Sequence, residues 1–139
     1  MPIIDRTKFT ADPKGDGLIG LVPFDGRTAA VSISFSTERS AVAWDTAERI
    51  LTVLRDDMSL VEQVVRDLMS RLGTANENTP DGRRKMERML SRLARSDMTC
   101  NITASGAGSV YFREPRFTGH CIGLQFHEGG KLALATLAG

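Results

Sequence analysis

The stretch of sequence that decides the fold lies near the end of the chain: Phe117-Thr118-Gly119-His120-Cys121-Ile122-Gly123-Leu124-Gln125-Phe126, followed by the closing Ala135-Thr136-Leu137-Ala138-Gly139. We interpret it as two adjoining strands, with His120 at the start of the first strand. This is the only part of the chain in which a fold signal and a possible site coincide. The rest of the sequence is typical of a soluble globular domain.

Further strand signals precede and follow this stretch. Residues 99–104, 109–112 and 132–137 have strand character, and glycines mark the reversals between them. Near the start of the chain, residues 18–24 and 28–35 are joined by Asp25-Gly26, a dipeptide whose tolerance of positive φ suits a tight hairpin. In the second of these strands apolar residues alternate with serines, which predicts one wet face: Val31, Ile33 and Phe35 on one side, and Ser32, Ser34 and Ser36 on the other.

Between the two groups of strands, the apolar period changes to that of helices. A first helix is predicted from about Thr37 to Asp56, and Trp44 falls beside its apolar stripe, where we expect it to flank the core. A second helix is predicted to begin at a capping box formed by Ser59 and Glu62, and to end at Gly73. A third helix follows the Thr79-Pro80-Asp81 signal and runs to about Arg95.

This order of elements predicts the class of fold. Strands grouped at both ends with helices between them are typical of an α+β domain. We predict a mainly antiparallel sheet with an N-terminal β-hairpin, three central helices on one face and about four C-terminal strands, all in a single domain over residues 1–139. A chain of this length buries about two-thirds of the surface that its unfolded form exposes, so no disulfide or metal is required for stability.

Composition excludes several classes of protein. Eighteen Lys and Arg residues nearly cancel 17 Asp and Glu residues, so the net charge of +1 points to no partner. Cys100 and Cys121 form no CxxC pattern and are too few for a disulfide framework, which favours a reducing compartment. The N-terminal residues include acid and base where a signal peptide needs an apolar core, and no apolar run has the length of a membrane span. We therefore expect a cytoplasmic protein without membrane contact.

His120 and Cys121 are adjacent and suggest a catalytic base and nucleophile. Neighbouring side chains on a strand point to opposite faces, so His120 is expected to share a face with Ile122, and Cys121 with Gly123. The two side chains cannot then be partners. We favour a partly buried His120 that fixes the strand end through a hydrogen bond, and keep it as a weak catalytic candidate.

The sequence predicts no metal and no cofactor. Cys121 and His127 share a face, but six residues of strand separate them by about 20 Å, which is too far for one ion. No calcium loop, phosphate-binding glycine loop or Gly-x-Ser-x-Gly motif occurs. No set of nucleophile, base and orienting group can therefore be assembled.

The third helix is locally strongly positive. Its cations recur at helical spacing beside an apolar stripe, so one face can dock on the core while a neighbouring face presents charge to a phosphate or an acidic protein. The candidate binding surface consists of Arg84, Lys85, Arg88, Arg92 and Arg95. The simpler interpretation is a solvated face whose cations pair with acids of the first two helices. Aromatic residues are not interleaved with these cations, which weighs against nucleic acid.

Three segments resemble a bacterial family known as domain of unknown function 2262. They are the opening Lys8-Phe9-Thr10 strand with the Asp25-Gly26 hairpin, the helix from Thr46-Ala47-Glu48 to Leu54, and the ending. In the ending, Gly119-His120-x-Ile122 is followed by a strand that finishes in Ala138-Gly139. The sequence differs from the family at its centre, where members more usually carry an Asn and a Trp after the second helix. The resemblance implies a small bacterial α+β domain and assigns no activity.

These observations leave three hypotheses for function. The first is a non-catalytic domain that binds another protein, as an immunity or accessory factor of bacterial conflict systems would, through the cations of the third helix and the serine face. The second is a nucleic-acid-binding module that uses Arg84, Lys85, Arg88, Arg92 and Arg95. The third is an enzyme that uses His120 with a distant carboxylate or Cys100.

Overall fold

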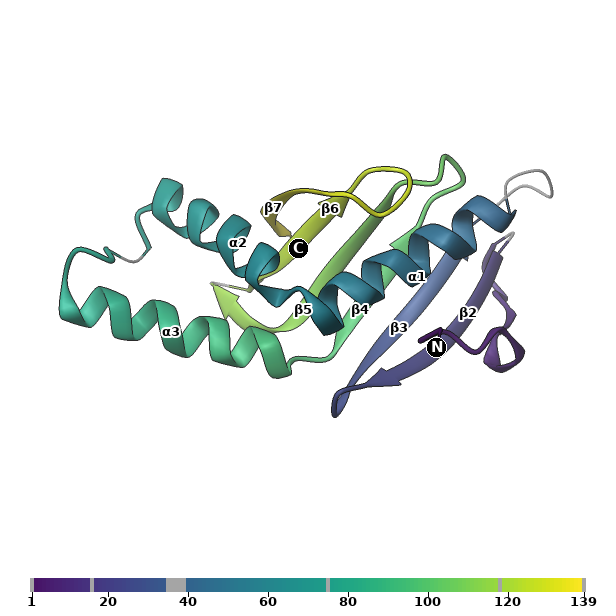
Figure 1. Cartoon of the computed structure of the whole chain (residues 1–139), viewed down its shortest axis with the longest axis horizontal. Coiled ribbons are helices and arrows are strands. Elements are labelled where there is room, and N and C mark those ends of the chain that lie inside the picture. Colours follow the sequence, from purple (N-terminus) through teal and green to yellow (C-terminus); the bar gives the residue numbers. More distant parts are fainter. Residues whose placement is uncertain (1, 16, 35–39, 75, 118, 139) are drawn as a thin grey trace.

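Over the residues that the structure describes, the architecture is a seven-stranded sheet with three α-helices on one face (Figure 1). The computed structural model describes residues 2–15, 17–34, 40–74, 76–117 and 119–138. The strands lie side by side in the order of the sequence: β1 (Thr10–Ala11), β2 (Gly17–Phe24), β3 (Arg27–Ser34), β4 (Met98–Ile102), β5 (Gly108–Phe117), β6 (His120–Phe126) and β7 (Leu132–Ala138). Every neighbouring pair is antiparallel except β3 and β4, which are parallel. The predicted α+β class is confirmed.

The parallel pair arises because all three helices lie in the connection between β3 and β4. They are α1 (Ser40–Asp56), α2 (Met58–Leu72) and α3 (Pro80–Arg95). Helix α1 packs across β3, β4 and β5, α2 packs on β7, and α3 packs on β5. The helices therefore cover one face of the sheet, as predicted. None of the helices in the described ranges is long and apolar enough to cross a membrane.

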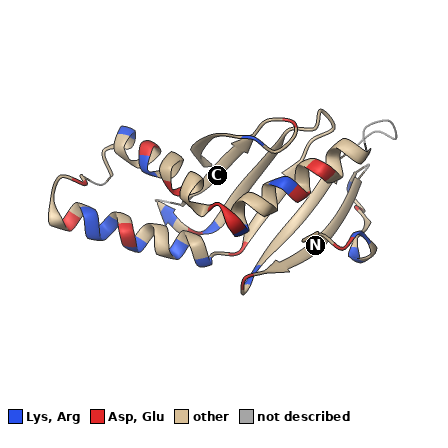
Figure 2. Ribbon diagram, viewed as in Figure 1, with Lys and Arg blue, Asp and Glu red and all other residues tan. Residues whose placement is uncertain are grey.

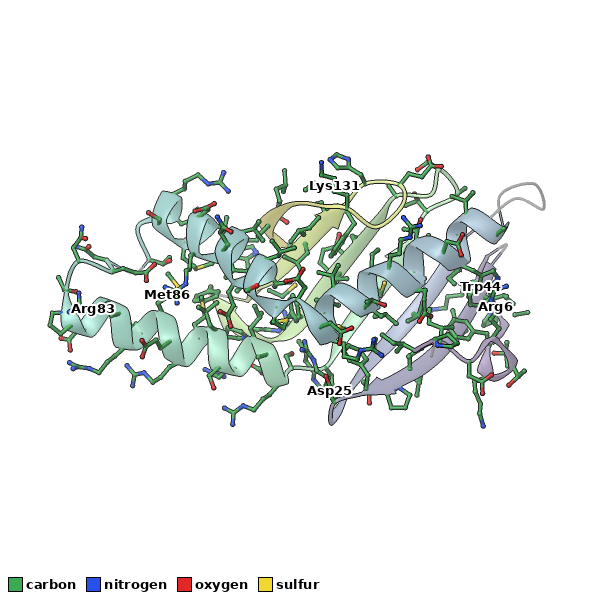
Figure 3. The ribbon with its side chains drawn as sticks, in the orientation of Figure 1. Arg6, Asp25, Trp44, Arg83, Met86 and Lys131 are labelled. Atoms are coloured by element: carbon green, nitrogen blue, oxygen red, sulfur yellow. The ribbon has the colours of Figure 1, made fainter. Side chains whose placement is uncertain are left out.

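The core lies between the helices and the covered face of the sheet. Fully buried side chains from both layers meet there, among them Ile33, Ile50, Leu51, Leu93 and Leu124. Trp44 flanks this core as predicted: it packs edge-on against Phe9 at 5.0 Å between ring centroids, and the Arg6 guanidinium lies over its ring (Figure 3). The N-terminal segment is also held to α1, because the backbone N–H groups of Ile3 and Ile4 donate to the Glu48 carboxylate.

Local signals placed most element ends correctly. Asp25 and Gly26 both have positive φ, 49° and 74°, which the tight turn between β2 and β3 requires. The Thr79 hydroxyl accepts from the Gly82 N–H at 3.0 Å and begins α3 where predicted. Gly73 ends α2 in the left-handed conformation, also as predicted.

Several predicted boundaries are wrong or lie outside the described residues. The capping box does not form, because α2 begins at Met58 and the Ser59 hydroxyl donates to the Asp57 carboxylate instead. The strand predicted over 109–112 is the ten-residue β5, and the one predicted over 99–104 is β4. Phe35, Ser36 and the predicted start of α1 at Thr37 lie outside the described residues.

Candidate functional site: the open face of the sheet

The sheet has an open face, which we define as the face turned away from α1, α2 and α3. Strand alternation places every second side chain there, opposite the buried Val22 and Val31. On β2 this puts Ile19, Leu21 and Pro23 outside, and Leu21 is 67% exposed. The neighbouring strands add small and polar groups and one aromatic ring: Thr28, Ala30 and Ser32 of β3, Thr99 of β4, and Tyr111 of β5. The open face is therefore apolar at its centre, and the wet face predicted for β3 is only part of it.

Two adjoining hollows lie on the open face. The larger, of about 740 Å³, is lined mainly by apolar atoms of β2 and β3, including Ile19, Leu21 and Pro23. The smaller, of about 340 Å³, extends over β4 and β5 to Tyr111 and Cys121. Leu21, Ala30 and Thr99 line both. We call the joined hollows the open-face depression.

One end of the open-face depression is basic. Arg113 and Arg116 of β5 line it, and a third hollow of about 350 Å³ continues from Arg113 to Arg92 and Arg95 near the end of α3. Asp97 lies at the same end and lines both hollows. Two acids offset part of this charge, in different ways. Glu114 pairs with Arg92 at 3.1 Å, and the Asp97 carboxylate accepts from the backbone N–H of Thr28 at 2.9 Å. This end of the depression thus combines four arginines with two carboxylates, each of which already has a partner.

The candidate surface on α3 divides into two parts. Figure 2 shows its cations along the length of the helix. Arg92 and Arg95 join the basic end of the open-face depression, whereas Lys85 and Arg88 line a separate polar hollow of about 450 Å³ beside Asn76 and Thr79. Arg84 pairs with Asp81 within the helix.

The acids of α1 and α2 are not the partners of these cations among the described residues. The ion pairs of α3 are made within the helix or with Glu114 of β5. Arg83 donates to the backbone oxygen of Glu77 at 3.1 Å, while Met86 points inward toward α2 (Figure 3). The predicted pairing with the first two helices is therefore wrong, because α3 turns its apolar stripe toward them.

His120 is an exposed side chain rather than the partly buried one expected. It opposes Phe117 in the β5–β6 ladder at the end of both strands. It makes no recorded hydrogen bond with a described residue and lines none of the hollows described above. The predicted separation from Cys121 is confirmed, because Cys121 lies opposite Arg116 on the open face.

The two cysteines lie on opposite faces of the sheet. Cys100 is buried against the helices, and burial raises the pKa of its thiol to about 12. Cys121 lines the open-face depression as a free thiol. In the described part of the chain, no three His, Cys, Asp or Glu side chains come close enough to hold a metal ion.

Arg27 is a positioning residue that the sequence did not reveal. Its side chain is 4% exposed, and it lies between the rings of Phe24 and Phe112, 5.5 and 5.8 Å from their centroids. Nε donates to the backbone oxygen of Ser96 at 3.0 Å, and Nη2 donates to the backbone oxygen of Leu93 at 3.3 Å. Burial lowers the pKa of this guanidinium. Arg27 thereby caps α3 and fixes the end of the helix beside Asp97.

Comparison with known proteins identifies no relative. No protein-family model, no curated protein and no solved structure matches the chain. The resemblance to domain of unknown function 2262 stays a prediction.

Proposed function

We propose that this chain is a protein-binding domain whose partner docks on the open-face depression. The observation that carries the proposal is the apolar centre of this face, where Ile19 and Leu21 of β2 are exposed while Val22 and Phe24 of the same strand are buried. A strand that is apolar on both sides is typical of a sheet that is covered on both faces. Contiguous exposed apolar patches mark interaction sites.

The charges around the depression indicate the kind of partner. Arg113 and Arg116 flank its apolar centre, and Arg92 and Arg95 extend the positive charge around the end of α3. Interfaces commonly combine an apolar centre with a polar rim whose charge complements the partner. We therefore expect a partner that presents apolar side chains next to carboxylates.

The same geometry favours binding over catalysis. The side chains that line the open-face depression include one carboxylate, Asp97, and its position is fixed by the N–H of Thr28. His120 lies outside the depression, and the thiol of Cys100 lies on the other face of the sheet. The depression is also lined by the thiol of Cys121, but none of the described residues that line it is a histidine that could serve as its base. The lining thus offers mainly apolar contact and charge. A role as an immunity or accessory factor is a finer form of this proposal, and a toxin-like reading frame beside the gene would support it.

Site-specific photo-crosslinking in the native host tests the proposal. A photo-reactive phenylalanine analogue is placed at position 21 in the depression and, as a matched control, at the exposed Gln63 on α2. We expect one discrete crosslinked protein from position 21 and none from position 63. Replacing both Arg113 and Arg116 with Glu should weaken that crosslink. Equal crosslinking at both positions, or no discrete product at position 21, would contradict a docking site on this face.

A further inference from the structure

The two edges of the sheet are protected to very different degrees. Edge strands with free backbone groups invite pairing with other chains, and proteins usually blunt them with short length, charge or proline. β1 is two residues long and is followed by Asp12-Pro13, so it is blunted in these ways. β7 extends over Leu132–Ala138 and contains neither charge nor proline. The β7 edge is therefore open to a further strand.

The backbone of β7 has free groups along this edge. Within the described ranges, β7 is the last strand in the sheet and pairs only with β6. In an antiparallel ladder every second residue of an edge strand turns its N–H and C=O outward, so a seven-residue strand offers about three such residues. Among the described residues, none is recorded as bonding to this side of β7. Leu134 is 46% exposed on the open face of the same strand.

Helix α2 adds a second contact surface beside this edge. Its inner residues pack over β7, and one flank faces α3: Arg66 pairs with Glu77 in the loop before α3, and Met69 shares a hollow with Met86. The opposite flank therefore faces outward beyond β7. At three- and four-residue spacing this flank carries Leu60, Val64, Asp67 and Arg71, of which Val64 is partly buried against the core. Leu60 is 45% exposed.

We propose that the β7 edge pairs with the β7 edge of a second copy of this chain, in an antiparallel two-fold dimer. Charge complementarity selects this occupant. The uncharged strand can face its own copy in any antiparallel register without opposing like charges. On the α2 flank, one acid and one base lie a turn apart, so a two-fold axis can set Asp67 of each copy toward Arg71 of the other. The proposal is independent of the partner on the open-face depression.

The size of this surface sets the expected affinity. β7 and the outer flank of α2 together offer about half of the 20–30 residues a side found in standard interfaces. We therefore expect a dimer that dissociates in the micromolar range. In it the sheet is continuous across the two copies, and both open-face depressions lie on one side.

Sedimentation equilibrium of the purified chain tests the dimer. We expect the wild-type mass to rise with concentration from 15.2 kDa toward twice that value. Leu134→Lys places like charges across the two-fold axis and should weaken association about tenfold or more. Leu21→Lys is the matched control, because it adds the same charge to an exposed leucine far from β7, and it should leave association unchanged. A mass of 15.2 kDa at every concentration, or equal weakening by the two variants, would overturn the proposal.

Hydrogen exchange of the wild type provides a test that needs no variant. In the dimer, the outward amides of residues 132–138 become paired, so their protection should rise with protein concentration across the same range as the mass. If circular dichroism shows that Leu134→Lys does not fold, Leu60→Glu takes its place in the sedimentation experiment and should weaken association. The hydrogen exchange of the wild type is then read together with that result. A dimer in which the exchange of residues 132–138 is independent of concentration would exclude β7 pairing.

Discussion

The covered and open faces of the sheet are built from alternate residues of the same strands, yet they have opposite relations to solvent. On the covered face, Val31, Ile33 and Leu124 are fully buried beneath the helices. On the open face, Leu21 and Ile19 are large and apolar but stay exposed, and Arg113 and Arg116 line the same hollow as Leu21. Apolar residues on the covered face account for folding. The same residue types on the open face contribute little to folding, and their presence there supports the proposed binding role.

The largest effect should come from truncating the same residue type on each face. Leu124→Ala removes fully buried methyl groups and should lower the free energy of unfolding by about 2–5 kcal/mol. Leu21→Ala, on the open face, should change it by less than about 0.5 kcal/mol. Urea unfolding monitored by circular dichroism measures both. A large loss for Leu21→Ala would mean that the open face is part of the folding core.

A second matched pair compares two arginines. Arg27→Met removes the donor that Arg27 supplies to the buried backbone oxygen of Ser96, while the Leu93 oxygen keeps the Ser96 N–H as a donor. The variant should cost about 1–3 kcal/mol of stability. Arg113→Met alters only the rim of the open face, and should cost less than about 0.5 kcal/mol while weakening partner binding. The two variants are compared by chemical unfolding and by the crosslinking yield from position 21. If both lose stability equally, Arg113 also has a structural role.

The thiol of Cys100 on the covered face should make the stability of the fold depend on pH. Folding raises the pKa of Cys100 from 9.0 to about 12, so the folded state keeps a proton that the unfolded state releases above pH 9. This contribution to stability is complete below pH 9 and is lost as pH rises toward 12. Between pH 9 and pH 10 the wild type should therefore lose about 1 kcal/mol more than Cys100→Ala. Unfolding curves at the two pH values measure the difference, and identical losses would show that the thiol is not held neutral.

The smallest effect is expected at the other end of α3. Lys85 and Arg88 line a polar hollow that also contains Asp81, and the N–H of Gly82 is already occupied by the Thr79 hydroxyl. An anion there would meet the Asp81 carboxylate, and the backbone N–H of Gly82 at the helix N-terminus is not available to it. We expect no binding of single- or double-stranded oligonucleotides at low salt, and no change for Lys85→Ala with Arg88→Ala. Binding that falls steeply with added salt would revive the nucleic-acid hypothesis.

Local patterns predicted most of the fold, because the signals at Asp25-Gly26, Thr79-Pro80 and Gly73 act within a few residues. The open face could not be predicted in the same way. Its character depends on register, which sets Leu21 opposite Ala30 and Ile19 opposite Ser32. One signal was present in the sequence: the nearly unbroken apolar run of β2 is typical of a strand with apolar residues on both faces.

Tertiary neighbours explain what the sequence did not predict at the site. Arg27 follows a turn, where a cation is usually solvated, and it becomes buried only because Phe112 and the end of α3 meet there. Arg92 and Arg95 were predicted as part of one basic row. Their grouping with Arg113, away from Lys85 and Arg88, depends on how α3 lies against β5.

The parallel pairing of β3 with β4 has a consequence for the rate of folding. β1–β3 and β4–β7 are each joined by short turns, so each group can form from contacts that are close in sequence. The ladder that unites them pairs Ala29 with Met98 and Ile33 with Ile102, across the whole helical segment. Contacts that close so long a loop form late, since the chain loses entropy before they stabilise it. We expect the parallel ladder to limit the folding rate, with the helices forming while the two groups of strands are still separate.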